Sequence, residues 1–336
     1  MPENEKKKPN SLSWLEQTYR KVSENRNASL AVIALLCFLI YSPTFFFSFT
    51  QYDDDFLIVN NMDSLTYVGN VGRIFQMPYF DYYYRPLVTL SLMIDAQLGG
   101  VQPVMYHITN VLLHIIASCL VFLVLKRIQS YREVALAGSI LFAVLPVISQ
   151  ATAWIPGRND SLLAVFVFAS LYMLLLYSET NQKKYIALHV LFFFAGLLTK
   201  ESALFVPLFA WFFITNVMKK KQSVSQFPLV ASWIIVLIAW WYLRDGALAQ
   251  IKEQHQILSL TTFVANLRVP FEILGKTFFP FNLSAYATFD NVSLAMGVGI
   301  CVAFLLLVVF NRQRIDRMMI LFGLGWFIVF LVPSLA

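Results

Sequence analysis

The sequence predicts an all-α protein that crosses a membrane several times, and three features lead to that prediction. Hydrophobic residues make up 58% of the 336 residues and charged residues only 13%, whereas soluble domains carry about 25% charged residues. The mean hydropathy is +0.65. The apolar residues form long runs between short loops rich in Lys and Arg. The net charge of +6 comes from loops of this kind, which is typical of cytoplasmic loops and argues against a nucleic-acid partner.

The first apolar run follows a polar tail of residues 1–29, which we expect to be cytoplasmic. The run of residues 30–49 is too long for the core of a signal peptide and ends in Phe-rich sequence, so we interpret it as a retained anchor. Further runs have about the length needed to cross a bilayer, although some are short. They are residues 106–125, 135–153, 162–177, 185–198, 203–217, 227–243, 294–310 and 318–335. Together with the anchor they predict about nine transmembrane helices within a single membrane domain, residues 30–336.

The charges support this threading of the chain. With a cytoplasmic N-terminus, 17 of the 25 Lys and Arg residues fall on the inner side, as the positive-inside rule requires. The outer side then carries 12 of the 19 acidic residues and eight basic ones. Mixed charges in short loops beside helix ends suit a site that handles a charged lipid head group, although ordinary surface charge has the same pattern.

Residues 257–282 are apolar enough to suggest a tenth crossing, but that crossing would move the last basic loop to the outer side. Pro270 interrupts the segment, and Arg268, Glu272 and Lys276 recur at four-residue spacing, which places them on one face of a helix. We therefore expect a helix that lies in the outer interface or re-enters the membrane from it.

The first outer segment, residues 51–103, contains the strongest candidate for a reaction centre. Asp53, Asp54 and Asp55 directly follow the first apolar run, so three carboxylates lie next to the membrane surface. Clustered negative charges are unfavourable there unless a nearby cation balances them. The alternative interpretation is a solvated acidic turn. Loops as long as this segment are usually functional in compact proteins.

Aromatic residues and one arginine follow the acids in the same segment. Tyr79, Phe80 and Tyr82 to Tyr84 form an aromatic cluster, which favours an interfacial belt for most of its members over stacking on sugar rings. Arg85 precedes Pro86, which stiffens the chain, so its guanidinium can serve as a bidentate phosphate ligand. Residues 87–98 can form a short amphipathic helix.

Two further outer loops add charges at the same predicted depth. One contains Arg158 and Asp160, and Asp160 could equally be the N-cap of a helix that begins at Ser161. The other places Lys200 and Glu201 between two short apolar runs, where a plain ion pair in the membrane is the alternative to a functional role.

Polar side chains also occur inside the predicted spans. His107, Asn110 and His114 share one face of the second crossing, and hydrogen bonding between helices is their expected role. No transition-metal site is predicted, because Cys or further His ligands at suitable spacing are missing.

The order of these motifs resembles the membrane part of the transmembrane and tetratricopeptide-repeat-containing proteins. The motifs are Tyr52 to Asp55 with Asn60 and Asn61, Tyr84 to Leu87, His107 through Asn110 to His114, Leu145 and Pro146 leading to Trp154, Gly157 to Asp160, Thr199 to Glu201, Phe279 to Ser284 and Phe330 to Ser334. The likeness covers residues 30–336 and extends to the GT-C superfamily of glycosyltransferases that use lipid-linked sugars, with its protein O-mannosyltransferases and aminoarabinose transferases.

The resemblance implies a GT-C-type helical bundle with a polyprenyl-phosphate sugar donor, an active site on the outer or lumenal face, and an acidic pair at Asp53 and Asp54. Two features depart from the family. Its members usually carry a tetratricopeptide array after the membrane part, whereas this sequence ends at Ala336, and the third acid, Asp55, leaves open which two carboxylates act.

The resulting hypothesis is an inverting glycosyltransferase of the hexosyltransferase type, similar to protein O-mannosyltransferases. Asp53 or Asp54 would be the general base that deprotonates an acceptor hydroxyl of a protein Ser or Thr, a glycan or a lipid. The donor phosphate would be bound by Arg85, Arg158 and Lys200, with Asp160, Glu201, Tyr84 and His107 in supporting positions.

A divalent cation, Mg²⁺ or Mn²⁺, would suit oxygen ligands such as Asp54 and Asp160, but no spacing fixes it. The alternative function is a non-catalytic lipid-binding, lipid-translocating or scaffold protein with the same fold. For the host membrane we expect the bacterial inner membrane first and the endoplasmic reticulum second, with the active site periplasmic or lumenal.

Overall fold

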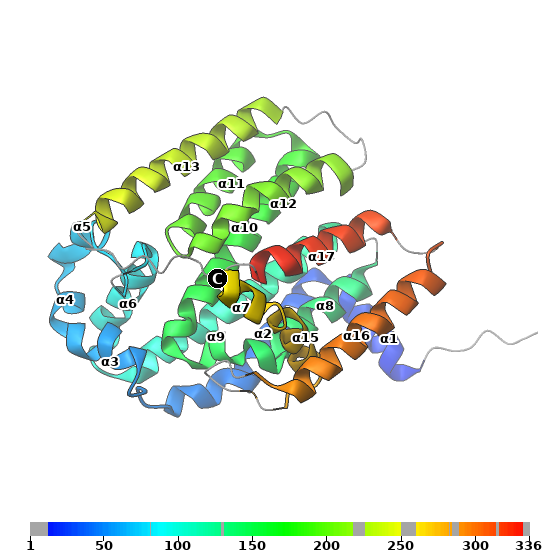
Figure 1. Cartoon of the computed structure of the whole chain (residues 1–336), viewed down its shortest axis with the longest axis horizontal. Coiled ribbons are helices and arrows are strands. Elements are labelled where there is room, and N and C mark those ends of the chain that lie inside the picture. The colour runs from blue at the N-terminus through cyan, green and yellow to red at the C-terminus, as the bar shows by residue number, and fades with distance from the viewer. Residues whose placement is uncertain are drawn as a thin grey trace, which may run out of the picture.

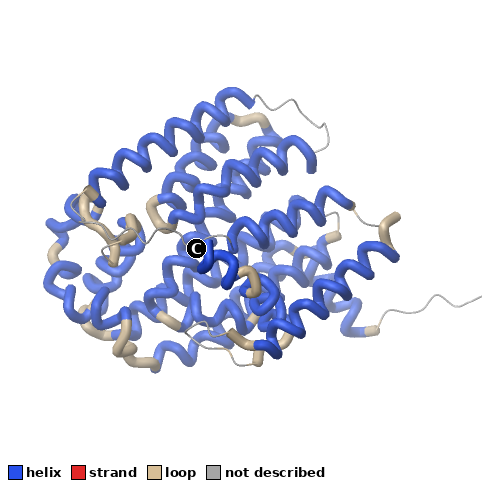
Figure 2. Tube along the Cα trace, in the orientation of Figure 1, coloured by secondary structure: helices blue, strands red, loops and turns tan. Residues whose placement is uncertain are grey.

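The computed structural model describes residues 13–80, 82–128, 131–217, 226–249, 260–281, 283, 289–313 and 316–331. These residues form helices joined by short loops, and none of them belongs to a β-strand (Figure 2). The predicted all-α class is therefore confirmed for the described part of the chain.

The α-helices have the following bounds: α1 Trp14–Glu24, α2 Arg26–Tyr41, α3 Asp53–Leu57, α4 Met62–Thr66, α5 Val71–Ile74, α6 Pro86–Gly99, α7 Pro103–Ile128, α8 Arg132–Val144, α9 Ser149–Ala153, α10 Arg158–Thr180, α11 Lys183–Leu197, α12 Val206–Phe212, α13 Gln226–Leu248, α14 Leu260–Asn266, α15 Val269–Phe278, α16 Asn291–Phe310 and α17 Arg317–Leu331. Short 3₁₀ turns are η1 Ser42–Phe46, η2 Val59–Asn61, η3 Val68–Asn70, η4 Pro146–Ile148, η5 Ile155–Gly157 and η6 Glu201–Phe205, and η7 Phe213–Val217 is a π-helical turn.

Five of the described helical segments are long and apolar enough to cross a membrane: Arg26–Phe46, Pro103–Ile128, Ile155–Thr180, Gln226–Leu248 and Asn291–Phe310. A sixth span results if α8 and the following segment Pro146–Ala153, which meet at an angle of 51°, are one bent crossing. The protein is thus a multi-pass membrane protein, since a crossing needs about 20 apolar residues.

Each of the nine predicted crossings coincides with a helix or a pair of helices. Some of these helices are short: α11 and α17 have 15 residues each, less than an untilted crossing needs. The number of nine crossings therefore stays a prediction. Residues 332–335 of the last predicted crossing lie outside the described residues.

The predicted interfacial segment, residues 257–282, contains α14 and α15, and residues 257–259 and 282 lie outside the described residues. Pro270 stands in the first turn of α15, where a missing N–H costs nothing. Helix α15 lies against α16 so closely that a Cβ added to Gly275 would be 2.1 Å from the backbone oxygen of Ser293. The two helices therefore pack as one hairpin, while their position relative to a membrane stays a prediction.

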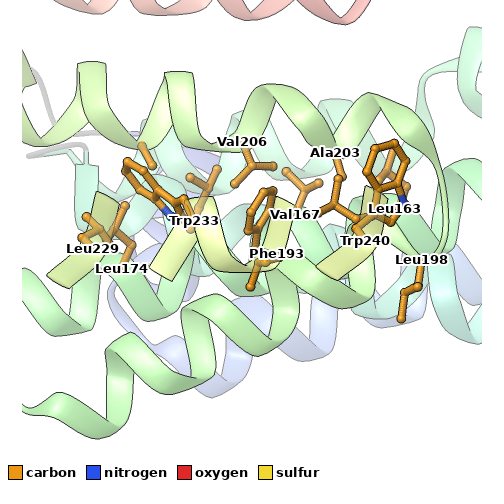
Figure 3. Packing of buried hydrophobic residues seen from close by; sticks show 14 of the residues in the cluster. Leu163, Val167, Leu174, Phe193, Leu198, Ala203, Val206, Leu229, Trp233 and Trp240 are labelled. Atoms are coloured by element: carbon orange, nitrogen blue, oxygen red, sulfur yellow. The ribbon is translucent and has the colours of Figure 1, made fainter. Parts of the chain in front are cut away.

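Helix α7 lies at the centre of the bundle and contributes to three apolar clusters. Near its start Tyr106 packs with α3 to α6, Phe122 packs with α2 and α8, and Val124 belongs to a cluster formed with α10 to α13. Figure 3 shows the last of these clusters, in which Trp233 and Trp240 of α13 lie on either side of Phe193. These clusters hold α7 and α10 fixed, and the candidate site lies where those two helices begin.

The bundle has two ends of different character. Helices α3 to α6 gather at one end, on the left of Figure 1, and α1 lies at the other. We call the first the acid-rich end and define it by residues 51–80, 82–103, 154–160 and 198–202. The second, the basic end, carries α1, residues 126–128, 131–132 and 179–184. Helix α7 runs from the first end to the second, a rise of about 39 Å for its 26 residues.

Candidate active site

Asp54 is the best-defined candidate among the three acids. It lies in the short helix α3 and is 1% exposed. Its Oδ2 accepts hydrogen bonds from the backbone N–H of Thr50 at 2.7 Å and from the Thr50 hydroxyl at 2.8 Å. Its Oδ1 is buried and has no hydrogen-bond partner among the described residues. One carboxylate oxygen is thus fixed and the other is free to accept a proton.

Burial raises the pKa of Asp54, and the charges of Asp53 and Asp55 add to that rise, while the two hydrogen bonds from Thr50 oppose it. Burial also raises the pKa of Asp53. Asp53 and Asp55 are only partly buried. A raised pKa brings a carboxylate closer to the range in which a general base works well near neutral pH, so the local environment favours Asp54 within the predicted acidic group.

Arg85 is held by Glu201, which lies far from it in the sequence. Its Nη2 and Nε approach Glu201 Oε2 at 3.1 and 3.3 Å, and its guanidinium lies 4.0 Å from the centre of the Tyr83 ring. Arg85 is 8% exposed. Tyr84, another predicted site residue, is buried and its hydroxyl donates to Phe75 O at 3.1 Å, which fixes the chain before Arg85.

Lys200 pairs with Asp160, and its Nζ also donates to Asn159 Oδ1 at 3.4 Å. The neighbouring residues Lys200 and Glu201 thus reach two different loops instead of each other. The possible capping role of Asp160 is wrong, because α10 begins at Arg158 with Gly157 at the N-cap position, so Asp160 lies inside its first turn. Through these pairs the three predicted outer segments meet at the acid-rich end.

Arg158 is fully buried in an ion pair with Asp95 of α6, at 2.5 Å from Nη2 to Oδ2. Its Nε donates to Asn110 Oδ1 at 2.8 Å and its Nη2 to Tyr106 O at 2.9 Å. The same Asn110 donates to backbone oxygens of residues 152 and 154. This network fastens α6, α7 and α10 together, so the geometry favours a positioning role for Arg158, and its predicted contact with the donor phosphate stays a prediction.

The two histidines of α7 differ in their partners. The Nε2 of His114 lies 3.0 Å from Ala143 O of α8, which confirms the expected bond between helices. His107 is 2% exposed, packs edge-on against the ring of Phe47, and neither of its ring nitrogens has a hydrogen-bond partner among the described residues. A supporting role of His107 at the site stays a prediction.

The described residues include no group of three or more His, Cys, Asp or Glu side chains that could hold a metal ion, and the divalent cation stays a prediction. Asp160 is exposed and paired with Lys200. An apolar cavity of about 310 Å³ lies between α7, α10 and α17, lined by residues such as Val124, Leu171 and Phe322. It borders the half of α7 near the basic end and is therefore separate from the acids.

The chain is similar to known proteins over part of its length. Residues 85–242 match the family model described as dolichyl-phosphate-mannose-protein mannosyltransferase, a segment that contains Arg85, Arg158 and Lys200. Protein O-mannosyl-transferase Tmtc1 of Drosophila melanogaster is 32% identical over 185 residues, which cover 53% of this chain and 21% of that protein. The chain is thus similar to proteins that are named protein O-mannosyl-transferases. This confirms the resemblance to the transmembrane and tetratricopeptide-repeat-containing proteins.

Other proteins with this name show the same similarity. Protein O-mannosyl-transferase TMTC4 of Mus musculus is 35% identical over 161 residues, covering 41% of this chain and 21% of that protein. TMTC1 of Mus musculus is 43% identical over 84 residues, 24% of this chain and 8% of that protein. The matched part of the chain thus spans about a fifth or less of the length of these relatives. No solved structure matches the chain.

Sequence reasoning missed three residues of the site. Thr50 fixes Asp54, and its position four residues before an acid was the available signal. Asp95 neutralises Arg158, and a carboxylate within an apolar helix was its signal. Tyr79 belongs to the aromatic cluster, for most members of which an interfacial belt was favoured; it is 4% exposed and its hydroxyl has no hydrogen-bond partner among the described residues.

Proposed function

We propose that this chain transfers a sugar from a polyprenyl-phosphate-linked donor to an acceptor hydroxyl, with Asp54 as the general base. The observation that carries the proposal is the buried carboxylate of Asp54: Thr50 fixes one oxygen, and the other has no hydrogen-bond partner among the residues that the structure describes. The relatives are called protein O-mannosyl-transferases, which favours mannose as the sugar and a protein Ser or Thr hydroxyl as the acceptor.

The reaction is a single displacement. Asp54 Oδ1 accepts the proton of the acceptor hydroxyl while the acceptor oxygen bonds to the anomeric carbon of the sugar. The bond from that carbon to the donor phosphate breaks on the opposite side, so the configuration inverts and polyprenyl phosphate leaves as the anion. General-base catalysis typically contributes about 10²- to 10⁴-fold.

The departing phosphate needs positive charge, and Arg85 and Lys200 are the cations best placed to supply it. Both are partly accessible: their side chains are 10% and 24% exposed, and they are oriented by Glu201 and Asp160. Preorganised cations cost little reorganisation as the leaving group gains charge. Arg158 acts indirectly in this proposal, because its contacts fix the start of α10 and with it Asp160.

A divalent cation remains part of the proposal only in a limited form. Mg²⁺ is often held by one or two carboxylates together with substrate phosphates, and the free Oδ1 of Asp54 fits a single such contact. Transfer measured with and without a chelator decides whether the reaction needs it.

For the host membrane we propose the endoplasmic reticulum, with the acid-rich end on the lumenal side. The relatives reported above come from a fly and a mouse, which favours the second of the two membranes considered from the sequence and gives the bacterial inner membrane no support.

The test is transfer of mannose from a polyprenyl-phosphate donor to a Ser- and Thr-containing peptide by the chain in reconstituted vesicles. Asp54→Asn should lower the rate by at least about 10²-fold while donor binding persists. Asp63→Asn is the matched control, because Asp63 is exposed in the same segment, and it should retain full activity.

Full activity of Asp54→Asn would contradict the role of Asp54 as the base. A wild-type chain that binds the lipid but turns over no donor would instead support the alternative of a non-catalytic lipid-binding protein.

A further inference from the structure

Tyr79 is a buried residue whose hydroxyl lacks a hydrogen-bond partner in the part of the chain that the structure describes. Its side chain is 4% exposed, and its hydroxyl forms no hydrogen bond with any described residue. Burying an unsatisfied hydroxyl destabilises a folded protein, so such groups are rare and call for an explanation. A ligand that accepts a hydrogen bond at this position would supply one.

The position of Tyr79 is fixed by a tight turn. The backbone N–H of Tyr79 donates to Tyr83 O at 2.7 Å, and the N–H of Tyr83 donates to Tyr79 O at 2.9 Å. Phe80 follows with a φ of +51°, a left-handed conformation that is costly for a bulky residue. Its ring stacks on the ring of Phe56 at 5.1 Å, with an angle of 9° between the planes. Because Phe56 belongs to α3, the turn is fastened to the helix that carries the acids.

Charges of both signs surround the Tyr79 side chain. The guanidinium carbon of Arg85 lies 5.8 Å from the centre of its ring. The positive charges of Arg85 and Arg158 lower the pKa of the Tyr79 hydroxyl, and the negative charges of Asp53 and Asp160 raise it. Burial is the largest influence and raises the pKa of Tyr79, so the hydroxyl stays protonated near neutral pH and can donate a hydrogen bond.

We propose that Tyr79 binds the donor lipid by donating a hydrogen bond from its hydroxyl to a phosphate oxygen. This assignment rests on the proposed function and names a residue of its donor site. A phosphate fits better than a sugar hydroxyl, because Arg85 beside the ring interacts more strongly with an anion than with a neutral hydroxyl. Tyr79 is then a specificity residue between the acids of α3 and the Arg85–Glu201 pair.

Tyr79→Phe tests the proposal because it removes the hydroxyl and keeps the ring. Two lipids are compared as ligands of the full chain in detergent: a polyprenyl phosphate without sugar and the same lipid with mannose. We expect the Kd for both lipids to rise about tenfold, as for the loss of a hydrogen bond to a charged group. The Tm without ligand should stay the same or rise, because an unsatisfied hydroxyl has been removed. Tyr82→Phe is the control, since Tyr82 lies in the same turn and is 71% exposed, and it should change neither quantity.

Each other outcome has a defined meaning. An unchanged Kd in Tyr79→Phe, or a lower Tm without ligand, overturns the proposal, the latter by revealing a structural partner of the hydroxyl. If Tyr79→Phe raises the Kd for the mannose lipid alone, the phosphate assignment is overturned in favour of a sugar hydroxyl. A wild-type chain that binds neither lipid overturns the proposed function and this assignment with it.

Discussion

Both ends of the bundle hold an arginine that pairs with a glutamate and lies over a tyrosine ring. At the acid-rich end Arg85 pairs with Glu201, with its guanidinium 4.0 Å from the ring centre of Tyr83. At the basic end Arg127 pairs with Glu179, with its guanidinium 5.0 Å from the ring centre of Tyr172. The same three residue types therefore form the same local arrangement twice.

The surroundings of the two arginines differ. The side chains of Arg85 and Glu201 are 10% and 28% exposed, whereas those of Arg127 and Glu179 are 27% and 45% exposed. The segment around Arg85 also contains Asp54 Oδ1 and the Tyr79 hydroxyl, two buried polar atoms without a hydrogen-bond partner in the described part of the chain. An ion pair that is exposed to water contributes little to the free energy of unfolding. Charges in a low-dielectric site interact strongly with one another and with ligands. The comparison teaches that burial and unsatisfied atoms, rather than residue types, distinguish the candidate site.

The largest expected effect concerns the most buried charges of the acid-rich end. Arg158→Met leaves Asp95 as a buried carboxylate without its cation, and Asn110 without its donor. We expect the free energy of unfolding to fall by about 3–5 kcal/mol, because an uncompensated buried charge is strongly destabilising. Chemical unfolding of the purified chain in detergent measures this quantity.

The control for this prediction is the double variant Asp95→Leu with Arg158→Met, which removes both charges. It should recover most of the lost stability, since apolar replacements of a buried ion pair are often neutral. A loss below about 1 kcal/mol in Arg158→Met alone would show that the pair is not buried as described, and the contrast between the two ends would weaken.

The next effect concerns Arg85. Arg85→Lys replaces a planar fork by a single ammonium group, so one of the two contacts with Glu201 and the stacking on Tyr83 are lost. We expect a loss of about 1–2 kcal/mol in the free energy of unfolding and an increase of about tenfold in the Kd for a polyprenyl phosphate. Unchanged binding would remove Arg85 from the proposed phosphate site.

The dependence of kcat/KM on pH tests the role of Asp54 as the general base. A general base must be ionised, and burial raises the pKa of Asp54 above its ordinary value. The acidic limb of kcat/KM should therefore lie above the pH of about 4 at which an ordinary Asp titrates. Below the raised pKa the rate should fall about tenfold for each pH unit, equivalent to about 1.4 kcal/mol. The residual activity of Asp54→Asn should lack this limb. A limb near pH 4 would contradict a buried base.

The helices and the meeting of the outer segments could be predicted from the sequence, because both follow from long apolar runs and from the sides on which charges fall. Arg85, Asp160, Lys200 and Glu201 were expected on one face and meet there through two ion pairs. The number of crossings could not be fixed, since helices as short as α11 fit a crossing only with help from their neighbours.

Partners between distant segments were beyond sequence reasoning. Nothing local indicates that Arg158 pairs with Asp95, or that Lys200 and Glu201 diverge to different loops. The capping role considered for Asp160 was wrong for a local reason. Helix α10 begins at Arg158, three residues before the predicted start at Ser161. Side-chain contacts of this kind depend on how helices pack, which residue patterns along one chain do not encode.

The smallest expected effect comes from the same substitution at the basic end. Arg127→Lys also exchanges a fork for an ammonium group beside a glutamate and a tyrosine ring, so it matches Arg85→Lys in chemistry. Since this pair is more exposed, we expect the free energy of unfolding to change by no more than about 0.5 kcal/mol. The Kd for a polyprenyl phosphate should stay unchanged, because helix α7 separates Arg127 from the acids by most of its length. If both substitutions weaken binding equally, losing a guanidinium has the same effect at either end, and the distinction between the two ends no longer locates the site.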